Sequence, residues 1–170
     1  MAILVTGGTG FIGSNIIKTL ARKGHRIVSF DLVSPDQLID KYLEPWKDQI
    51  EYIQGDILNE EDLEKMTELR ITKIVHAAVF TGILPTIESS KARSIVDINV
   101  LGTANLLELA RKISPERFLY VSSGAVYGIG SPSDEILHEE SSLKPNNLYS
   151  MTKYMSELLT KRYGELFGFD

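Results

Sequence analysis

The sequence predicts an α/β fold, a doubly wound parallel sheet with helices on both faces. Short apolar runs alternate with longer amphipathic segments along the 170 residues. A glycine-rich turn also follows the first apolar run, where such folds pass from a strand into a helix. We therefore expect one three-layer α/β/α domain that spans residues 1–170.

The first half of the chain alternates strands with a helix. Its expected elements are, in order, a strand over Ala2–Val5, a helix over Phe11–Lys23, and strands over Arg26–Phe30 and Ile50–Ile53. The strands are apolar at successive positions, as in strands buried on both faces. Gly24 fits the position that follows a helix. Residues 31–46 form a polar segment punctuated by proline.

The second half repeats the alternation with longer helices. Its expected elements are a helix over Asn59–Leu69, a strand over Lys73–Ala78, a helix over Ser90–Ile113, a strand over Phe118–Val121 and a helix over Leu148–Phe167. Asn59 is a suitable helix cap, and the acidic residues that follow it suit the positive end of a helix. Residues 124–146 are expected to be mostly loop.

Composition excludes several classes of function. The net charge is −5 and no Lys/Arg-rich run is present, so no nucleic-acid partner is expected. The absence of cysteine excludes thiolate metal sites, and the three histidines lack metal-ligand spacing, so no metal is expected. The apolar run at the N-terminus is too short for a signal peptide or a membrane span. A cytoplasmic protein that makes no membrane contact is the default expectation.

The glycine-rich turn predicts a dinucleotide site. Gly7, Gly10 and Gly13 lie between the first strand and the first helix. Such a turn lets the backbone approach a pyrophosphate and directs the helix N-terminus at it. Asp31 follows the second strand, where an acidic residue takes the ribose hydroxyls of NAD, and it disfavours the 2′-phosphate of NADP. The alternatives are a turn without ligand and an aspartate that merely begins a loop.

Tyr149 and Lys153 are four residues apart in the last expected helix, so they share one face. A nearby ammonium group favours the phenolate and lowers the pKa of a tyrosine, which is about 10 in isolation. The pair is a candidate for proton transfer if a redox cofactor lies nearby. Alone, such a pair is more often a solvated helix face.

With these residues in place, the chain resembles the extended short-chain dehydrogenase/reductases of the NAD-dependent epimerase/dehydratase type, which have a Rossmann fold. The resemblance spans the whole chain. It rests on the joint order of the following motifs: Thr6–Gly13, Asp31, Gly55-Asp56-Ile57, His76-Ala77-Ala78, Asn99–Thr103, Val121–Gly128 and the Tyr149/Lys153 pair.

The resemblance implies a cofactor role for several residues. The pyrophosphate turn would be lined by Gly7, Gly10, Phe11 and Ile12. The adenosine ribose would bind Asp31, the adenine would contact Asp56 and Ile57, and Ala77 and Ala78 would form a flat wall. An alternative for Asp56 is a cap before a helix. His76 is expected to have a structural role. For Asn99, a buried hydrogen-bonding role is at least as well supported as a direct role in the chemistry.

The resemblance also implies a mechanism. The active-site hydroxyl is expected at Ser123, four residues before the tyrosine of the Val-Tyr-Gly motif, and Ser122 is the less favoured alternative. Ser123 would orient the substrate oxygen while Tyr149, as phenolate, takes the hydroxyl proton. Hydride would pass from the adjacent carbon to the nicotinamide. Lys153 would lower the pKa of Tyr149 and hydrogen-bond the nicotinamide ribose.

The chain stops at Asp170, whereas members of this family continue into further strands and a C-terminal substrate region. We expect a fragment that lacks that region, with the fifth strand at a sheet edge and weakened NAD affinity.

The acidic, proline-containing segment Glu139–Pro145 favours a nucleotide-sugar substrate. The alternatives are a non-catalytic NAD-binding module and a reductase of steroid or flavonoid type. The resemblance also implies a homodimer formed through the two longest helices.

Overall fold

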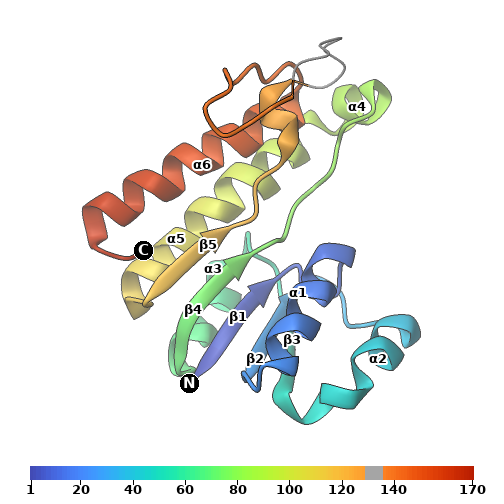
Figure 1. Cartoon of the computed structure of the whole chain (residues 1–170), viewed down its shortest axis with the longest axis vertical. Helices are drawn as coiled ribbons and strands as arrows, with labels where there is room; N and C mark the ends of the chain where they lie inside the picture. The colour runs from blue at the N-terminus through green and yellow to red at the C-terminus, as the bar shows by residue number, and fades with distance from the viewer. Residues whose placement is uncertain (129–135) are drawn as a thin grey trace.

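The computed structural model describes residues 1–128 and 136–170, and its centre is a parallel sheet in the order β3-β2-β1-β4-β5 (Figure 1). The strands are β1 (Ala2–Thr6), β2 (Ile27–Asp31), β3 (Ile50–Gln54), β4 (Ile71–His76) and β5 (Arg117–Tyr120). The first strand is central, so the strand order reverses between β1 and β4. Because all five strands are parallel, their carboxyl ends meet at one edge, where ligands bind in such sheets.

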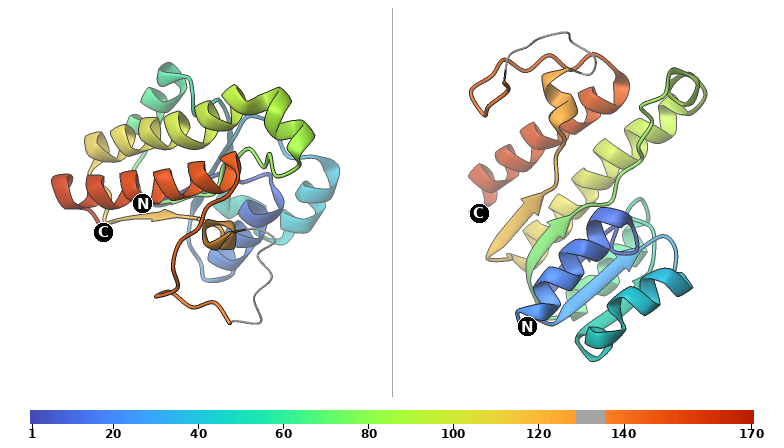
Figure 2. Two further views of the ribbon diagram at one scale, coloured as in Figure 1. Left: turned by 90° about the horizontal axis from the view of Figure 1, so that it is seen from above. Right: turned by 45° about the vertical axis from the view of Figure 1, so that its right-hand side comes forward.

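Helices cover both faces of the sheet, which confirms the expected three layers. They are α1 (Phe11–Arg22), α2 (Gln37–Leu43), α3 (Glu60–Glu64), α4 (Pro85–Val96), α5 (Gly102–Ile113) and α6 (Leu148–Phe167), with short 3-10 segments at Glu44–Gln49, Lys65–Glu68 and Gly124–Tyr127. Figure 2 shows α1 and α2 on one face, with α5 and α6 side by side on the other. No helix in the described ranges combines the length and apolar character needed to cross a membrane.

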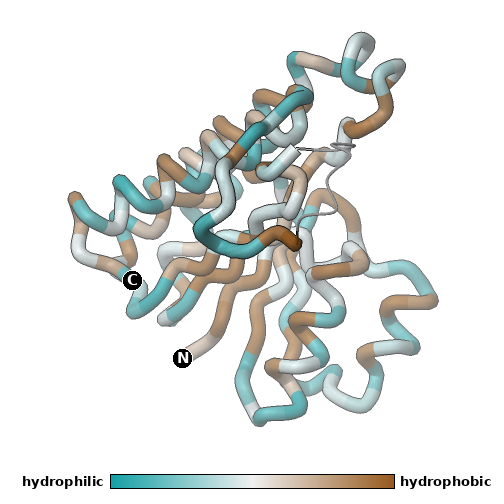
Figure 3. Tube along the Cα trace, turned by 45° about the horizontal axis from the view of Figure 1, so that its top comes forward, coloured by the Kyte–Doolittle hydropathy of each residue, from teal (hydrophilic) through white to brown (hydrophobic). Residues whose placement is uncertain are grey.

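Two apolar cores follow from the alternation of side chains along β1. Leu4 faces the core shared with α3 and α5, against which Leu159 and Tyr163 of α6 pack. Ile3 and Val5 face the opposite core, shared with α1 and α2. The strands carry hydrophobic colours over most of their length in Figure 3. Burial on both faces explains why they are apolar at successive positions.

The segment between β2 and β3 contains a helix that the sequence analysis did not predict. Asp36 caps α2, since its side chain accepts a hydrogen bond of 2.8 Å from the backbone N–H of Ile39. Leu43 is buried at the end of this helix. The helix has only 7 residues, too few for a clear helical pattern beside Pro35 and Pro45.

The expected helix over Ser90–Ile113 begins earlier and is not uniform. It starts at Pro85, and Lys91 interrupts α4 with φ of −126° and ψ of 20°. A π-helical turn over Asp97–Leu101 then separates α4 from α5. The expected helix over Asn59–Leu69 is likewise divided, because α3 ends at Glu64 and a 3-10 turn follows.

The last residues of the chain run beside β5, the expected edge strand. The Phe118 N–H donates to the carbonyl oxygen of Asp170, and the Asp170 carboxylate pairs with Arg117 at 3.1 Å. Phe169 is buried against Phe118, with ring centroids 6.2 Å apart. The backbone groups of the β5 edge are therefore partly satisfied at the strand's amino end. Of the expected loop over 124–146, residues 129–135 lie outside the described part of the chain.

Candidate functional site

The turn after β1 has a conformation that glycine alone adopts without strain. Gly7 has φ of +68°, and a Cβ atom there would meet the backbone nitrogen of Ala78 at 2.7 Å. Its N–H donates to the carbonyl oxygen of Phe30 at 3.0 Å. The turn is thus held between the ends of β2 and β4, which places Ala77 and Ala78 beside the glycines.

The start of α1 is built for close backbone approach. A Cβ atom on Gly13 would lie 2.0 Å from the carbonyl oxygen of Gly7, so the helix packs directly on the turn. The helix begins at Phe11 after Gly10, and no side chain caps it. Phe11 and Ile12 are exposed there. The first N–H groups of α1 are consequently left for an anion at the carboxyl edge of the sheet.

Asp31, the last residue of β2, is joined directly to the glycine turn. Its Oδ2 accepts a hydrogen bond of 3.0 Å from the backbone N–H of Thr9. This bond was not foreseen, because the sequence does not show which turn residue the carboxylate meets. It fixes the carboxylate beside the start of α1. The carboxylate oxygens can still accept further hydrogen bonds.

Asp56 and Ile57 follow β3 at the same edge, but their side chains differ in environment. The Asp56 carboxylate accepts from the N–H of Leu58 at 2.8 Å and so stabilises the turn before α3. The side chain that caps α3 belongs to Asn59. Ile57 is buried in the core, where it packs against Gly102. The adenine contact expected of this pair stays a prediction.

His76 is a buried link between three elements, in agreement with its expected structural role. Its Nδ1 lies 2.7 Å from the hydroxyl of Thr6, and its Nε2 lies 3.0 Å from that of Thr103. Thr103 donates its own proton to the Asn99 carbonyl, so Nε2 carries the imidazole proton and Nδ1 accepts. Burial, with a smaller effect of the Lys153 charge, lowers the pKa of His76 to about 3. The ring therefore stays neutral.

Asn99, in the π-helical turn, fastens α6 to the segment after β4. Its side-chain oxygen accepts from the Phe80 N–H at 2.8 Å, and its amide donates to the Phe80 carbonyl and the Thr152 hydroxyl. Its backbone carbonyl also accepts from the Ser156 hydroxyl at 2.7 Å. Asn99 is buried. A hydrogen-bonding role is thus observed for the side chain, and it holds the helix that carries Tyr149.

Tyr149 and Lys153 are both buried on the inner face of α6. The Lys153 ammonium donates to the carbonyl oxygen of Val121 at 2.6 Å and lies 4.2 Å from the centroid of the Tyr120 ring. Burial lowers the pKa of Lys153 to about 8, while Glu157 opposes this shift. Burial raises the pKa of the Tyr120 phenol, which leaves that residue neutral.

The serine pair lies directly after the carbonyl that Lys153 binds. The Ser123 hydroxyl accepts from the Ala125 N–H at 3.2 Å and caps the 3-10 turn over Gly124–Tyr127. Ser122 has a buried hydroxyl without a hydrogen-bond partner within residues 1–128 and 136–170. Lys153 thus brings the Tyr149 helix to the serine segment, at the same sheet edge as the glycine turn.

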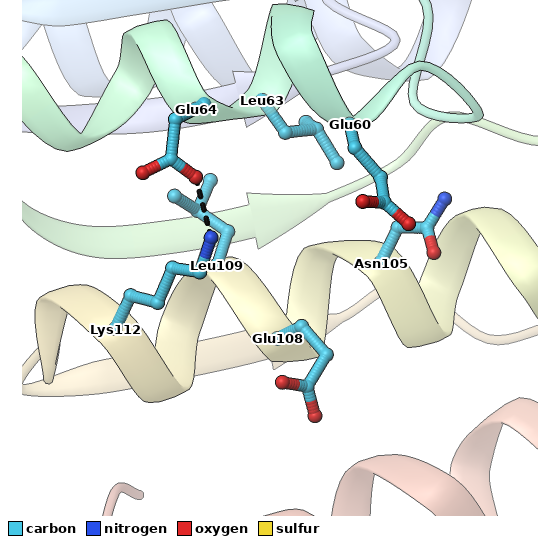
Figure 4. Close-up of a pocket in the computed structure, with 7 residues that line it drawn as sticks. All are labelled: Glu60, Leu63, Glu64, Asn105, Glu108, Leu109 and Lys112. Carbon is cyan, nitrogen blue, oxygen red and sulfur yellow. Dashed lines mark hydrogen bonds and ion pairs between the residues drawn. The ribbon is translucent and has the colours of Figure 1, made fainter.

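A hollow on the surface lies away from this edge, between α3 and α5 (Figure 4). It has a volume of about 280 Å³ and is lined by Glu60, Leu63, Glu64, Asn105, Glu108, Leu109 and Lys112. Three of its charged side chains form ion pairs, Glu64 with Lys112 and Glu108 with the neighbouring Arg111. No cluster of His, Asp or Glu with metal-binding character occurs among the described residues.

A family model supports the resemblance seen in the motifs. The model of the NAD dependent epimerase/dehydratase family matches residues 3–170. A dTDP-D-glucose 4,6-dehydratase from Mus musculus is 33% identical over 172 residues, which cover 98% of this chain and 47% of that protein. A 3-beta-hydroxysteroid dehydrogenase from Mycolicibacterium neoaurum is 32% identical over 161 residues, which cover 91% of this chain and 41% of that protein.

The fold agrees with a solved structure of similar sequence. The crystal structure of UDP-glucuronic acid 4-epimerase from Bacillus cereus, in complex with UDP-glucuronic acid and NAD, superposes with a TM-score of 0.84 at 29% identity. The match covers 99% of this chain and 54% of that one. The chain thus spans about half the length of the proteins it matches.

Proposed function

Because the chain belongs to the NAD-dependent epimerase/dehydratase family, we propose that it is the cofactor-binding half of an oxidoreductase that acts on nucleotide sugars. The bond from Lys153 to Val121 carries this proposal, since it brings the Tyr149 helix to the carboxyl edge of the sheet. The dehydratase and epimerase relatives favour a sugar nucleotide as substrate. The activity itself is a property of a full-length enzyme.

The glycine turn suits the pyrophosphate of NAD. A side chain at Gly7 would collide with Ala78, and one at Gly13 with the Gly7 carbonyl, so the turn stays narrow. No side chain caps the first helical N–H groups, those of Phe11 and Ile12, which suits them to an anion. The N–H of Gly10 donates to the Gly7 carbonyl and shapes the turn. Bound NAD would supply the hydride acceptor of the reaction.

The adenosine end of the cofactor would lie beside β2 and β3. The Asp31 carboxylate, held by the Thr9 N–H, would accept hydrogen bonds from the ribose hydroxyls. Its negative charge disfavours a 2′-phosphate. Asp56 and Ile57 follow the neighbouring strand and would hold the adenine, although the Ile57 side chain is itself in the core. Ala77 and Ala78 leave a flat wall after β4.

The chemical step falls to three residues near the end of β5. The Ser123 hydroxyl orients the substrate oxygen through a hydrogen bond. The Tyr149 oxygen takes the proton of the substrate hydroxyl, and the Lys153 charge stabilises the phenolate. Lys153 would also hold the nicotinamide ribose through a hydrogen bond from its ammonium group. Lys153 is buried, which strengthens its interaction with a phenolate relative to the same interaction in water.

Calorimetric titration with NAD tests the cofactor proposal on this chain. We expect binding that Asp31→Asn weakens and that Tyr149→Phe leaves nearly unchanged. Absence of binding at millimolar NAD would overturn the assignment. In an enzyme extended to full length, Tyr149→Phe should abolish turnover, and surviving activity would contradict the mechanism.

A steroid substrate is the second candidate, because a 3-beta-hydroxysteroid dehydrogenase is among the relatives. Either substrate would lose its proton to the same residues of this cofactor-binding half. Two assays of the extended enzyme distinguish the candidates: chromatographic conversion of a UDP-sugar to an isomer or a dehydrated product, which returns the hydride and leaves no net NADH, and production of NADH from a 3β-hydroxysteroid. A non-catalytic NAD-binding module would give neither.

A homodimer through α5 and α6 remains part of the proposal. Leu159 and Tyr163 pack in the core, whereas Leu101, Met155 and Leu158 are about half exposed, at 47%, 48% and 51%. A dimer that buried these side chains together would remove their apolar surface from water. Sedimentation of the wild type should show a dimer that Leu158→Glu disrupts, and a monomeric wild type would refute it.

A further inference from the structure

The first turn of α6 is capped from two sides. Asn147 forms a capping box with Ser150, whose N–H donates to the Asn147 side chain at 2.8 Å. That local cap does not satisfy the N–H of Leu148, the first residue of the helix. Instead, the Leu148 N–H donates to the Glu88 carboxylate at 2.6 Å. Glu88 is 60 residues away in the sequence, so this contact depends on the tertiary fold.

Glu88 lies in a turn that is separate from the rest of its helix. It belongs to the first turn of α4, and the non-helical Lys91 follows three residues later. The remainder of the long helix is fastened independently by Asn99, which binds Thr152 on the inner face of α6. A carboxylate at a helix N-terminus forms a strong, charge-assisted hydrogen bond. Asn99 acts on the first turn of α6 from its far side, since the Thr152 hydroxyl donates to the Tyr149 carbonyl, whereas Glu88 restrains the first amide of α6.

We propose that Glu88 is a positioning residue for Tyr149. Tyr149 directly follows Leu148, so a bond that fixes the Leu148 amide fixes the backbone from which the Tyr149 ring projects. Proton transfer requires the phenol oxygen to be placed within a fraction of an ångström. This inference rests on the proposed function, in which Tyr149 meets the substrate and lies beside the nicotinamide end of NAD.

The test compares Glu88→Ala and Glu88→Gln with a matched control, Glu61→Ala. Glu61 is also an acidic residue in the first turn of a helix, α3. Amide hydrogen exchange at Leu148 should become at least about tenfold faster in Glu88→Ala. It should be partly restored in Glu88→Gln, whose amide oxygen still accepts, and be unchanged in the control.

Ligand binding separates positioning from a general loss of structure. Glu88→Ala displaces the whole Tyr149 ring, whereas Tyr149→Phe removes only its hydroxyl, so Glu88→Ala should bind NADH about three- to tenfold more weakly. Its affinity for ADP, which lacks the nicotinamide half, should stay within about twofold of wild type. Equal losses for both ligands would overturn the proposal, as would unchanged exchange at Leu148. If the wild type binds neither ligand, the proposed function fails, whereas the exchange result still decides whether Glu88 holds the turn.

Discussion

The ammonium nitrogen of Lys153 lies 2.6 Å from the carbonyl oxygen of Val121. This bond joins the longest helix to the segment that follows the edge strand. The ammonium group is also buried, and its pKa falls to about 8. Burial therefore disfavours the same ammonium charge that is proposed to stabilise a phenolate. As a result, Lys153 loses its proton in the mildly alkaline range.

Replacing Lys153 with Met should alter the pH dependence of stability. Between pH 8 and 10.5 the unfolded chain keeps a Lys153 proton that the folded chain has released. The free energy of unfolding of the wild type should therefore rise with pH across this window, relative to Lys153→Met, by up to about 1.4 kcal/mol per pH unit. Urea unfolding at several pH values measures the difference, and a constant difference would contradict the prediction.

Acid should destabilise the fold through His76. Its folded pKa of about 3 lies below its ordinary value of 6.5, so the unfolded chain binds a proton in this range that the folded chain does not. Stability attributable to His76 should fall as the pH drops from 6.5 toward 3, by up to about 1.4 kcal/mol per unit. Wild type and His76→Gln should therefore converge in stability on acidification. If His76→Gln fails to fold, Thr103→Val should retain the slope of the wild type.

Gly13→Ala should disturb the turn because its Cβ atom would lie 2.0 Å from the Gly7 carbonyl oxygen. We expect a loss of about 1–3 kcal/mol in the free energy of unfolding, from forced displacement of packed backbone, and markedly weaker NAD binding. Gly124→Ala is the control, because nothing lies within 4 Å of the added atom. Its stability should stay within about 0.5 kcal/mol of the wild type. Equal stability of the two variants would refute the steric argument.

Asn99→Ala should cost about 2–3 kcal/mol, since it leaves the Phe80 backbone groups without their side-chain partner. Thr152→Val removes the hydrogen bond that Asn99 donates and the one that the Thr152 hydroxyl donates to the Tyr149 carbonyl within α6. It should cost about 1 kcal/mol. Thermal unfolding of both variants gives the comparison. If Thr152→Val lost as much stability as Asn99→Ala, the main effect of Asn99 would be its contact with α6 and not its contacts with the Phe80 backbone.

Local signals in the sequence were sufficient where one residue type determines the backbone. Gly24 has φ of +82° and directly follows the C-cap of α1. The expected bounds of the last helix, Leu148–Phe167, are those of α6. The spacing of Gly7 and Gly13 was informative because a side chain at Gly13 would collide with the nearby Gly7 carbonyl. In each case the physical cause lies within one or two turns of chain.

Contacts between distant segments could not be predicted from the sequence alone. The hydrogen bond from Thr9 to Asp31 requires β1 and β2 to be paired, and Glu88 meets Leu148 only once α4 and α6 are docked. The π-helical turn at Asn99 was also missed, since one extra residue in a helix hardly changes its apolar pattern. These features arise from tertiary packing, which a single sequence does not display.

The central position of β1 has a consequence for the folding of the chain. β1 pairs with β2 after one short helix, whereas its other partner, β4, brings together Thr6 and His76 across 70 residues. Closing that long loop has an entropic cost that local contacts do not offset until β4 arrives. Parallel pairing of this kind raises contact order and slows folding. The rate of folding should thus be set by the docking of β4 onto a preformed β1–β2–β3 unit.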